Sequence, residues 1–153
     1  MGTIPRCIAF IGIVLMVASC ADATGPARQL HVTITASSGI ASSDQPVSIT
    51  VAAVNHADEP LTLGSSSCPE AYEVATPRGK PVAPGPAVCP LIARSEVLEP
   101  GERLEFSYEW AGTTREWAGG PMVMLPPERY LLRGVVFAEG EKIVSAVIPI
   151  EVQ

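Results

Sequence analysis

The chain has 153 residues, and its 10 Lys and Arg against 16 Asp and Glu give it a formal net charge of −6. Because this acidic chain shows no basic stripe, we expect no nucleic-acid partner. Its length suits one domain with a substantial hydrophobic core.

The first 19 residues predict an export signal. Arg6 gives the start of the chain a basic side chain, and residues 8–17 are all apolar or glycine. A run of about 10 residues is too short to cross a ~30 Å hydrocarbon core as a helix. It matches the apolar region of a secretory signal peptide, which small residues follow.

The segment Val17-Ala18-Ser19-Cys20 ends this run and resembles the bacterial lipobox. The resemblance implies that residues 1–19 are removed and that Cys20 becomes a lipidated first residue. Two or more acyl chains hold a protein on a bilayer far more firmly than one. Ala21 stands where an inner-membrane retention signal often has aspartate, which favours the outer membrane in a cell that has one. A plain signal peptide with an incidental cysteine is the alternative.

Four cysteines occur in the chain, and two of them are accounted for by this segment. Cys7 would leave with the signal and Cys20 would carry lipid. Cys68 and Cys89 remain, and an even pair in an exported domain predicts a disulfide. It would close a loop of about 20 residues and stabilise the fold by roughly 3 kcal/mol. A metal site would need more ligands nearby, and a reactive thiol is the other alternative.

The mature chain is expected to begin with a short lipidated tether, residues 20–28, and to continue as one domain over residues 29–153. Residues 30–35 alternate apolar and polar, as a half-buried strand does. Residues 47–53 predict a second strand and residues 61–63 the start of a third. The short polar turn between them, residues 55–60, favours pairing of these two strands as an antiparallel unit.

The second half of the chain carries the clearest pattern. Residues 103–110 alternate strictly, with Leu, Phe, Tyr and Trp on one face. Residues 142–152 predict one closing strand, in which Pro149 indicates an edge or a bulge. Residues 77–90 hold five prolines and predict a loop, with Arg78 and Lys80 in a turn. Residues 122–125, Met-Val-Met-Leu, are expected to pack inside.

Seven or eight short strands with turn signals about every ten residues predict an all-β fold, an antiparallel immunoglobulin-like β-sandwich. A partly closed β-barrel is the alternative. The order of Val54-Asn55, Leu61, Leu98-Glu99-Pro100-Gly101, Phe106 to Trp110, and Pro126 to Gly134 resembles the immunoglobulin-like domains of the BsuPI type, named for an intracellular proteinase inhibitor. The resemblance covers roughly residues 46–138, and Glu128 stands where that group has a glycine. It implies the sandwich fold and suggests proteinase inhibition.

No catalytic constellation is recognisable. His31 and His56 are isolated in sequence and lack a carboxylate at ligand spacing, so surface or turn roles are expected rather than a metal site. Residues 65–67 are three serines without the surroundings of a nucleophile. Glu102, Glu105 and Glu109 with Arg103 indicate a solvated strand face, and an acidic docking strip is the alternative.

Trp117 is the candidate binding residue, because aromatic side chains in loops are frequent anchors for partners. The role that we favour for this side chain is nevertheless to cap one open end of the core. The sequence therefore predicts a lipid-anchored, non-enzymatic module of the cell envelope, without metal or cofactor, that binds or scaffolds an envelope component. A proteinase inhibitor, with the Cys68–Cys89 loop as inhibitory element and a protease as partner, is the alternative function.

Overall fold

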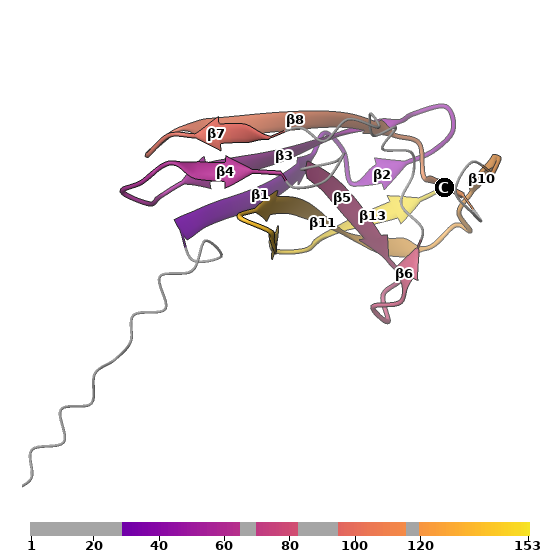
Figure 1. Cartoon of the computed structure of the whole chain (residues 1–153). Coiled ribbons are helices and arrows are strands. Elements are labelled where there is room, and N and C mark those ends of the chain that lie inside the picture. The colour runs from indigo at the N-terminus through magenta and orange to yellow at the C-terminus, as the bar shows by residue number, and fades with distance from the viewer. Residues whose placement is uncertain (1–28, 65–69, 83–94, 116–119) are drawn as a thin grey trace, which may run out of the picture.

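The computed structural model describes residues 29–64, 70–82, 95–115 and 120–153, which form a β-sandwich (Figure 1). The smaller sheet has the antiparallel order β1-β3-β8, made of β1 (Leu30–Ala36), β3 (Val47–Asn55) and β8 (Arg103–Trp110). The larger sheet has the order β2-β13-β11-β4-β7, made of β2 (Ile40–Ala41), β13 (Ile148–Val152), β11 (Arg129–Ala138), β4 (Leu61–Leu63) and β7 (Glu96–Leu98). The predicted all-β sandwich is confirmed, and the described residues form 13 strands instead of the seven or eight expected.

Three further strands extend the larger sheet, and two form a separate hairpin. β12 (Glu141–Val144) and β5 (Glu70–Ala75) pair with β11, and β6 (Pro81–Val82) pairs with β5. β9 (Thr113–Arg115) and β10 (Met122–Met124) form the hairpin. In the described part of the chain no helix is long and apolar enough to cross a membrane.

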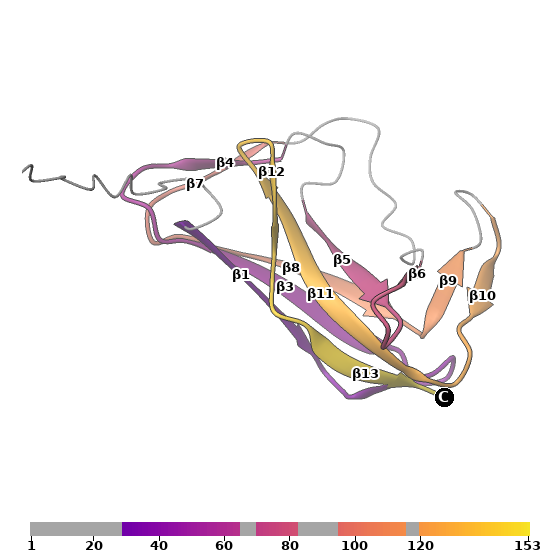
Figure 2. The same ribbon diagram turned by 90° about the horizontal axis from the view of Figure 1, so that it is seen from below.

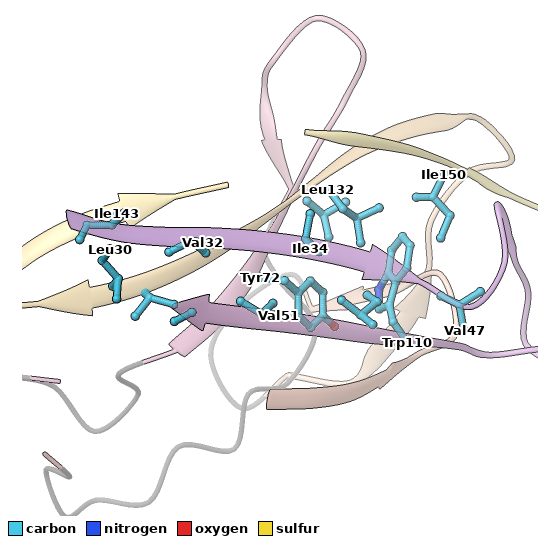
Figure 3. Packing of buried hydrophobic residues seen from close by; sticks show 14 of the residues in the cluster. Leu30, Val32, Ile34, Val47, Val51, Tyr72, Trp110, Leu132, Ile143 and Ile150 are labelled. Carbon is cyan, nitrogen blue, oxygen red and sulfur yellow. The ribbon is translucent and has the colours of Figure 1, made fainter. Parts of the chain in front are cut away.

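The core lies between the two sheets and follows the alternation of their strands. Inward residues of β3 are at most 1% exposed, namely Val47, Ile49, Val51 and Ala53. They share one cluster with Leu132 and Ile150 from the larger sheet, and Figure 3 shows Val47 and Ile150 beside Trp110 and Val51 beside Tyr72. Tyr72 of β5 meets Tyr108 of β8 edge to face, with ring centroids 5.3 Å apart, so an aromatic pair joins the two sheets.

The strict alternation predicted for residues 103–110 is confirmed. In β8 the charged and serine positions are exposed, whereas Leu104, Phe106 and Tyr108 are half-buried and Trp110 is buried. The indole Nε1–H of Trp110 donates to the carbonyl of Thr113 at 2.9 Å. This bond satisfies the only polar atom that the indole ring brings into the core.

β11 is the central strand of the larger sheet and uses both of its edges. One edge pairs with β5 from Leu131 to Val136, and the other pairs with β13 and then with β12. The closing strand predicted over residues 142–152 is therefore wrong, because it is two strands. Two residues of β11, Arg133 and Gly134, lie opposite three residues, 145–147, which makes a β-bulge.

The bulge reverses which residues face the core. Ile143 is buried before it and Ile150 after it, so the inward positions change from odd to even numbers, and Val144 is 43% exposed. The hydroxyl of Ser145 accepts from the backbone N–H of Gly134 at 2.8 Å and so takes the place of a ladder carbonyl. Pro149, where an edge or a bulge was predicted, follows the bulge and lies outside the part of β13 that pairs with β2, which is Glu151 and Val152.

The pairing expected between residues 47–53 and 61–63 is wrong. β3 pairs with β1 and β8, whereas β4 pairs with β7 and β11, so residues 56–60 carry the chain from one sheet to the other. A turn of this length can either close a hairpin or cross between sheets. The crossing is stabilised here by Asn55, which is fully buried at the end of β3.

The side-chain amide of Asn55 forms hydrogen bonds with two connections between the sheets, the one from β3 to β4 and the one from β7 to β8. Its Nδ2 donates to the carbonyl of Glu59 at 2.9 Å and to the carbonyl of Leu98 at 2.8 Å, and its Oδ1 accepts from the N–H of Ala57 at 2.8 Å. Its backbone N–H and carbonyl bind Glu102 and Gly101 in the turn between β7 and β8. Both connections between the sheets at this end therefore depend on one residue.

Met122 and Met124 were expected inside, and this expectation is wrong. They are 38% and 42% exposed on β10, whereas Leu125 is buried. The reason is that β10 pairs with β9 outside the sandwich, so only the residue that leaves the hairpin reaches the core.

Replacement of Asn55 by Ala should lower the free energy of unfolding by about 3 kcal/mol, because it leaves buried carbonyl and N–H groups without partners. Asn55→Asp should also destabilise, since a carboxylate cannot donate to the two carbonyls. Denaturant unfolding checks this, with Ser107→Ala on the exposed face of β8 as the control. A loss for Asn55→Ala no larger than that of the control contradicts the role.

Gly134→Ala should destabilise the sandwich by about 1–3 kcal/mol, because its new methyl group would lie 2.9 Å from Cγ1 of Val51 in the opposite sheet. Combining it with Val51→Ala should recover part of the loss, which a double-mutant cycle of unfolding free energies measures. Gly39→Ala is the matched control, since nothing lies within 4 Å of its Cβ position. Strictly additive losses in the cycle would show that the two sheets do not meet at this point.

Candidate binding groove

A groove of about 370 Å³ opens on the larger sheet between the β5–β6 hairpin and the bulge after β12. Apolar or glycine positions form most of its lining, and three charged side chains complete it: Val74, Ala75, Gly79, Pro81, Val82, Leu131 and Val147, with Glu73, Arg133 and Lys142. Ala75 and Leu131 lie directly opposite each other on β5 and β11 and form the floor. Such a mixture of apolar surface with a few convergent polar groups is typical of binding sites.

The three charged side chains come from three different strands and meet at one end of the groove. Glu73 of β5 lies opposite Arg133 of β11, whose Nε and Nη2 donate to its Oε2 at 2.7 and 2.6 Å. Lys142 of β12 donates to the other oxygen, Oε1. Two cations on one carboxylate leave this end of the groove with a net charge of +1.

The pKa of Glu73 reflects this arrangement. Partial burial acts to raise it, but the hydrogen bonds and charges of Lys142 and Arg133 outweigh burial and bring the pKa below the ordinary value. Glu73 therefore stays ionised under neutral conditions and holds both cations at the groove.

The other end of the groove is the turn between β5 and β6, and it is also basic. The N–H of Gly79 donates to the carbonyl of Thr76 at 2.8 Å, and Gly79 takes a φ of 76°, which glycine tolerates best. The exposed Arg78 and Lys80 flank it, as predicted for a turn. The turn therefore presents two cations without a carboxylate between them.

Basic residues are unevenly distributed over the domain. The whole chain has 10 Lys and Arg; two of them, Arg133 and Lys142, line this groove, and two more, Arg78 and Lys80, flank the lining residue Gly79. The exposed face of β8 carries two glutamates, Glu105 and Glu109, and one cation, Arg103. The groove is thus a positive region on an acidic protein, which favours an anionic ligand.

The two ends of the groove lie at different distances from the start of the domain. At the ion cluster, Ile143, which follows Lys142 on β12, lies beside Leu30 at the start of β1 (Figure 3), whereas Figures 1 and 2 show the β5–β6 hairpin well away from the start of β1. The two connections that bind Asn55 lie at the β1 end, since Leu30 pairs with Asn55. The end of the groove at the β5–β6 turn therefore lies away from the point where the chain enters the fold, and the ion cluster lies nearer to that point.

The candidate residues predicted from sequence alone are Cys20, Cys68, Cys89 and Trp117, and all four lie outside the described residues. The lipidation, the disulfide, the inhibitory loop and the aromatic anchor stay predictions. The groove residues were missed by the sequence analysis, because Glu73 is 60 positions from Arg133 and 69 from Lys142. The one available signal was Arg133 itself, which interrupts an apolar run.

The histidines are not as isolated in space as in sequence. His31 and His56 lie on the exposed surface near the start of β1, with ring centroids 6.0 Å apart. Within the described ranges no group of three or more His, Cys, Asp or Glu side chains is arranged to hold a metal ion.

The glutamates of the predicted solvated face separate into two sets. Glu105 pairs with Arg103, whereas Oε2 of Glu102 accepts from the N–H of Glu99 at 2.8 Å and stabilises the turn before β8.

No family model and no curated protein matches the chain. Among solved structures, a β-glucosidase from Erythrobacter marinus matches at 13% identity and a TM-score of 0.50, over 81% of this chain and 15% of the glucosidase. An alkylpurine DNA glycosylase from Pseudomonas fluorescens matches at 10% identity and 0.46, over 82% of this chain and 30% of that one. A putative ApaA protein from Bordetella pertussis matches at 15% identity and 0.46, over 79% and 91%. The chain spans less than a third of the first two, and the likeness concerns fold alone.

The free energy of unfolding should fall as pH drops below the ordinary glutamate pKa of about 4.3 and through the lower pKa of folded Glu73. The sign follows because a lowered pKa contributes stability above the unfolded value and loses it on protonation. Glu73→Gln should lack this contribution, which we expect to be below about 1 kcal/mol because the cluster is partly exposed. Titration of the Glu73 carboxyl carbon by NMR checks the direction. A midpoint at or above the ordinary value would contradict the ion cluster.

Proposed function

We propose that this protein is a lipid-anchored, non-enzymatic β-sandwich module that binds another component of the cell envelope through the groove between β5, β6, β11 and β12. The observation that carries the proposal is the groove itself, an apolar floor with cations at both ends on a protein of net charge −6. Apart from its three charged side chains, the lining consists of aliphatic, proline and glycine residues. Such a lining supports recognition rather than chemical catalysis.

The lipobox-like segment ending in Cys20 supports the anchor. Only residues 20–28 lie between the proposed lipid and the domain, so the start of β1 would stay close to the membrane. The end of the groove at the β5–β6 turn lies farther from that start and would be accessible to other envelope components. This arrangement suits a module that captures a partner while it is held on the bilayer.

The resemblance to immunoglobulin-like domains agrees with a binding role, since that architecture serves many recognition modules. The hydroxyl of Tyr130, at the start of β11, donates to the carbonyl of Pro126 at 3.1 Å. A tyrosine that binds the backbone a few residues upstream is a recurring feature of such sandwiches. Burial and the charge of Glu128 raise the pKa of Tyr130, which keeps this hydroxyl protonated as a donor.

Cys20→Ser should abolish incorporation of labelled fatty acid, because serine lacks the thiol that carries the lipid. The protein should then leave the membrane fraction, because the acyl chains that hold it there are missing. Fractionation and acyl labelling of cells expressing the full-length chain measure both effects. Ala21→Ser, beside the same site, is the control and should keep the label. Retention of Cys20→Ser in the membrane to the same extent as the parent would refute the anchor.

A photo-crosslinking residue at Val147, which lines the groove and is 55% exposed, should capture a partner in intact cells. The same residue at Ser107, on the exposed face of β8, should not capture it. Equal capture from both positions, or capture from neither, would count against the groove as the recognition surface.

A further inference from the structure

Resting on the proposed binding function, we infer that the groove takes an extended acidic peptide of a partner protein, with an aliphatic side chain between two carboxylates. The peptide would place one carboxylate at Arg133 and Lys142, its aliphatic side chain on Leu131, and the second carboxylate at the Arg78–Lys80 turn. Each part of this assignment follows from a separate feature of the groove.

The first carboxylate is assigned by the hydrogen-bond donors that remain at the ion cluster. Arg133 uses Nε and Nη2 on Glu73, and its Nη1 group is not part of that contact. Lys142 uses one of its ammonium N–H groups on the same carboxylate. The side chains of Arg133 and Lys142 are 43% and 42% exposed, so an incoming carboxylate can reach both. The incoming carboxylate would change a cluster of two cations and one carboxylate into a neutral cluster of two cations and two carboxylates.

The aliphatic side chain is assigned by the floor and walls of the groove. Leu131 lies two positions from Arg133 on β11, so their side chains project from the same face about 7 Å apart. Ala75 lies opposite Leu131, and the small alanine leaves room above the strand. Pro81, Val82 and Val147 line the sides. An aliphatic group seated here would cover apolar surface that is otherwise open to water.

The second carboxylate is assigned by the turn. Along β5 the chain passes from Glu73 to Ala75 and then enters residues 76–80, so the turn continues the line that runs from the ion cluster over the floor. Arg78 and Lys80 are exposed on it. In an extended peptide, alternate residues share one face. The groove therefore fits acid, any residue, aliphatic, any residue, acid.

The position of the groove favours a peptide over an anionic membrane surface. The β5–β6 turn, which carries Arg78 and Lys80, lies away from the start of β1, where the proposed tether enters (Figures 1 and 2). A flat lipid surface would also leave the concave floor at Leu131 unused, whereas an extended peptide can follow it.

The experiment uses the full-length protein in detergent micelles and fluorescein-labelled capped peptides, followed by fluorescence anisotropy. The probe has the central sequence Glu-Ser-Val-Ser-Glu. We expect about tenfold weaker binding when both acids are changed to Gln, and about tenfold weaker binding when Val is changed to Gly. Binding of the acidic probe should also weaken as salt is raised.

Protein variants test the assignment from the other side. Lys142→Glu and Lys80→Glu should each weaken binding of the acidic probe at least about tenfold, through the loss of an attraction and the gain of a repulsion. Arg103→Glu is the matched control, because it makes the same change of charge on an exposed residue of β8 and should leave binding unchanged. Circular dichroism and thermal unfolding verify that all three variants are folded.

Two outcomes would overturn the inference. The first is equal affinity for the Glu and Gln probes, or equal effects of Lys142→Glu and Arg103→Glu. The second is that no peptide binds, while the Cys20→Ser protein binds vesicles with 30% phosphatidylglycerol and loses this binding when Lys80 or Lys142 is replaced. This result would assign the cations to a membrane surface. Crosslinking from Val147 separates this failure from that of the proposed function. If a partner is captured there and the charge variants do not weaken peptide binding, the proposed binding function is retained and the acidic peptide is rejected as the ligand.

Discussion

The fold depends on the hydrogen bonds of one buried amide. Asn55 ends β3, and its side chain holds the carbonyl of Glu59 in the crossing from β3 to β4 and the carbonyl of Leu98 before the crossing from β7 to β8. β3 and β8 pair in one sheet, while β4 and β7 pair in the other. The two crossings therefore lie side by side, and a single side chain satisfies backbone groups in both. An apolar residue here would leave these buried groups unpaired, which is why the position requires an amide.

The alternation of residues predicted the faces of individual strands well. β8 follows it at every position, because each of its residues faces either the core or water. Alternation could not reveal the bulge at residues 145–147, since one extra residue changes the face without changing the composition. It also could not distinguish a hairpin from a crossing at residues 56–60, because both use a short polar turn. Asn55 resembles an ordinary turn residue in the sequence, and only its burial distinguishes it.

The candidate site was less predictable from the sequence than the fold, because it depends on the order of the strands in the sheet. Glu73, Arg133 and Lys142 each occupy an ordinary outward position of a strand, and no local motif connects them. They meet because β11 pairs with β5 on one edge and β12 on the other. Strand order is a property of the whole fold, so it is absent from any window of the sequence. By contrast, the turn at Arg78 and Lys80 was predictable, because its proline and glycine act locally.

The separation of the β5–β6 turn from the start of β1 has a mechanical consequence. If the anchor pulls on the start of β1 and a partner pulls on this turn, the load has a large component along the strands. β1 is an edge strand that pairs with β3 over seven residues, from Leu30 opposite Asn55 to Ala36 opposite Ile49. A pull along this ladder shears its hydrogen bonds together, whereas a pull across it would open them one after another. The strand that receives the tension first is thus held in the orientation that resists it best.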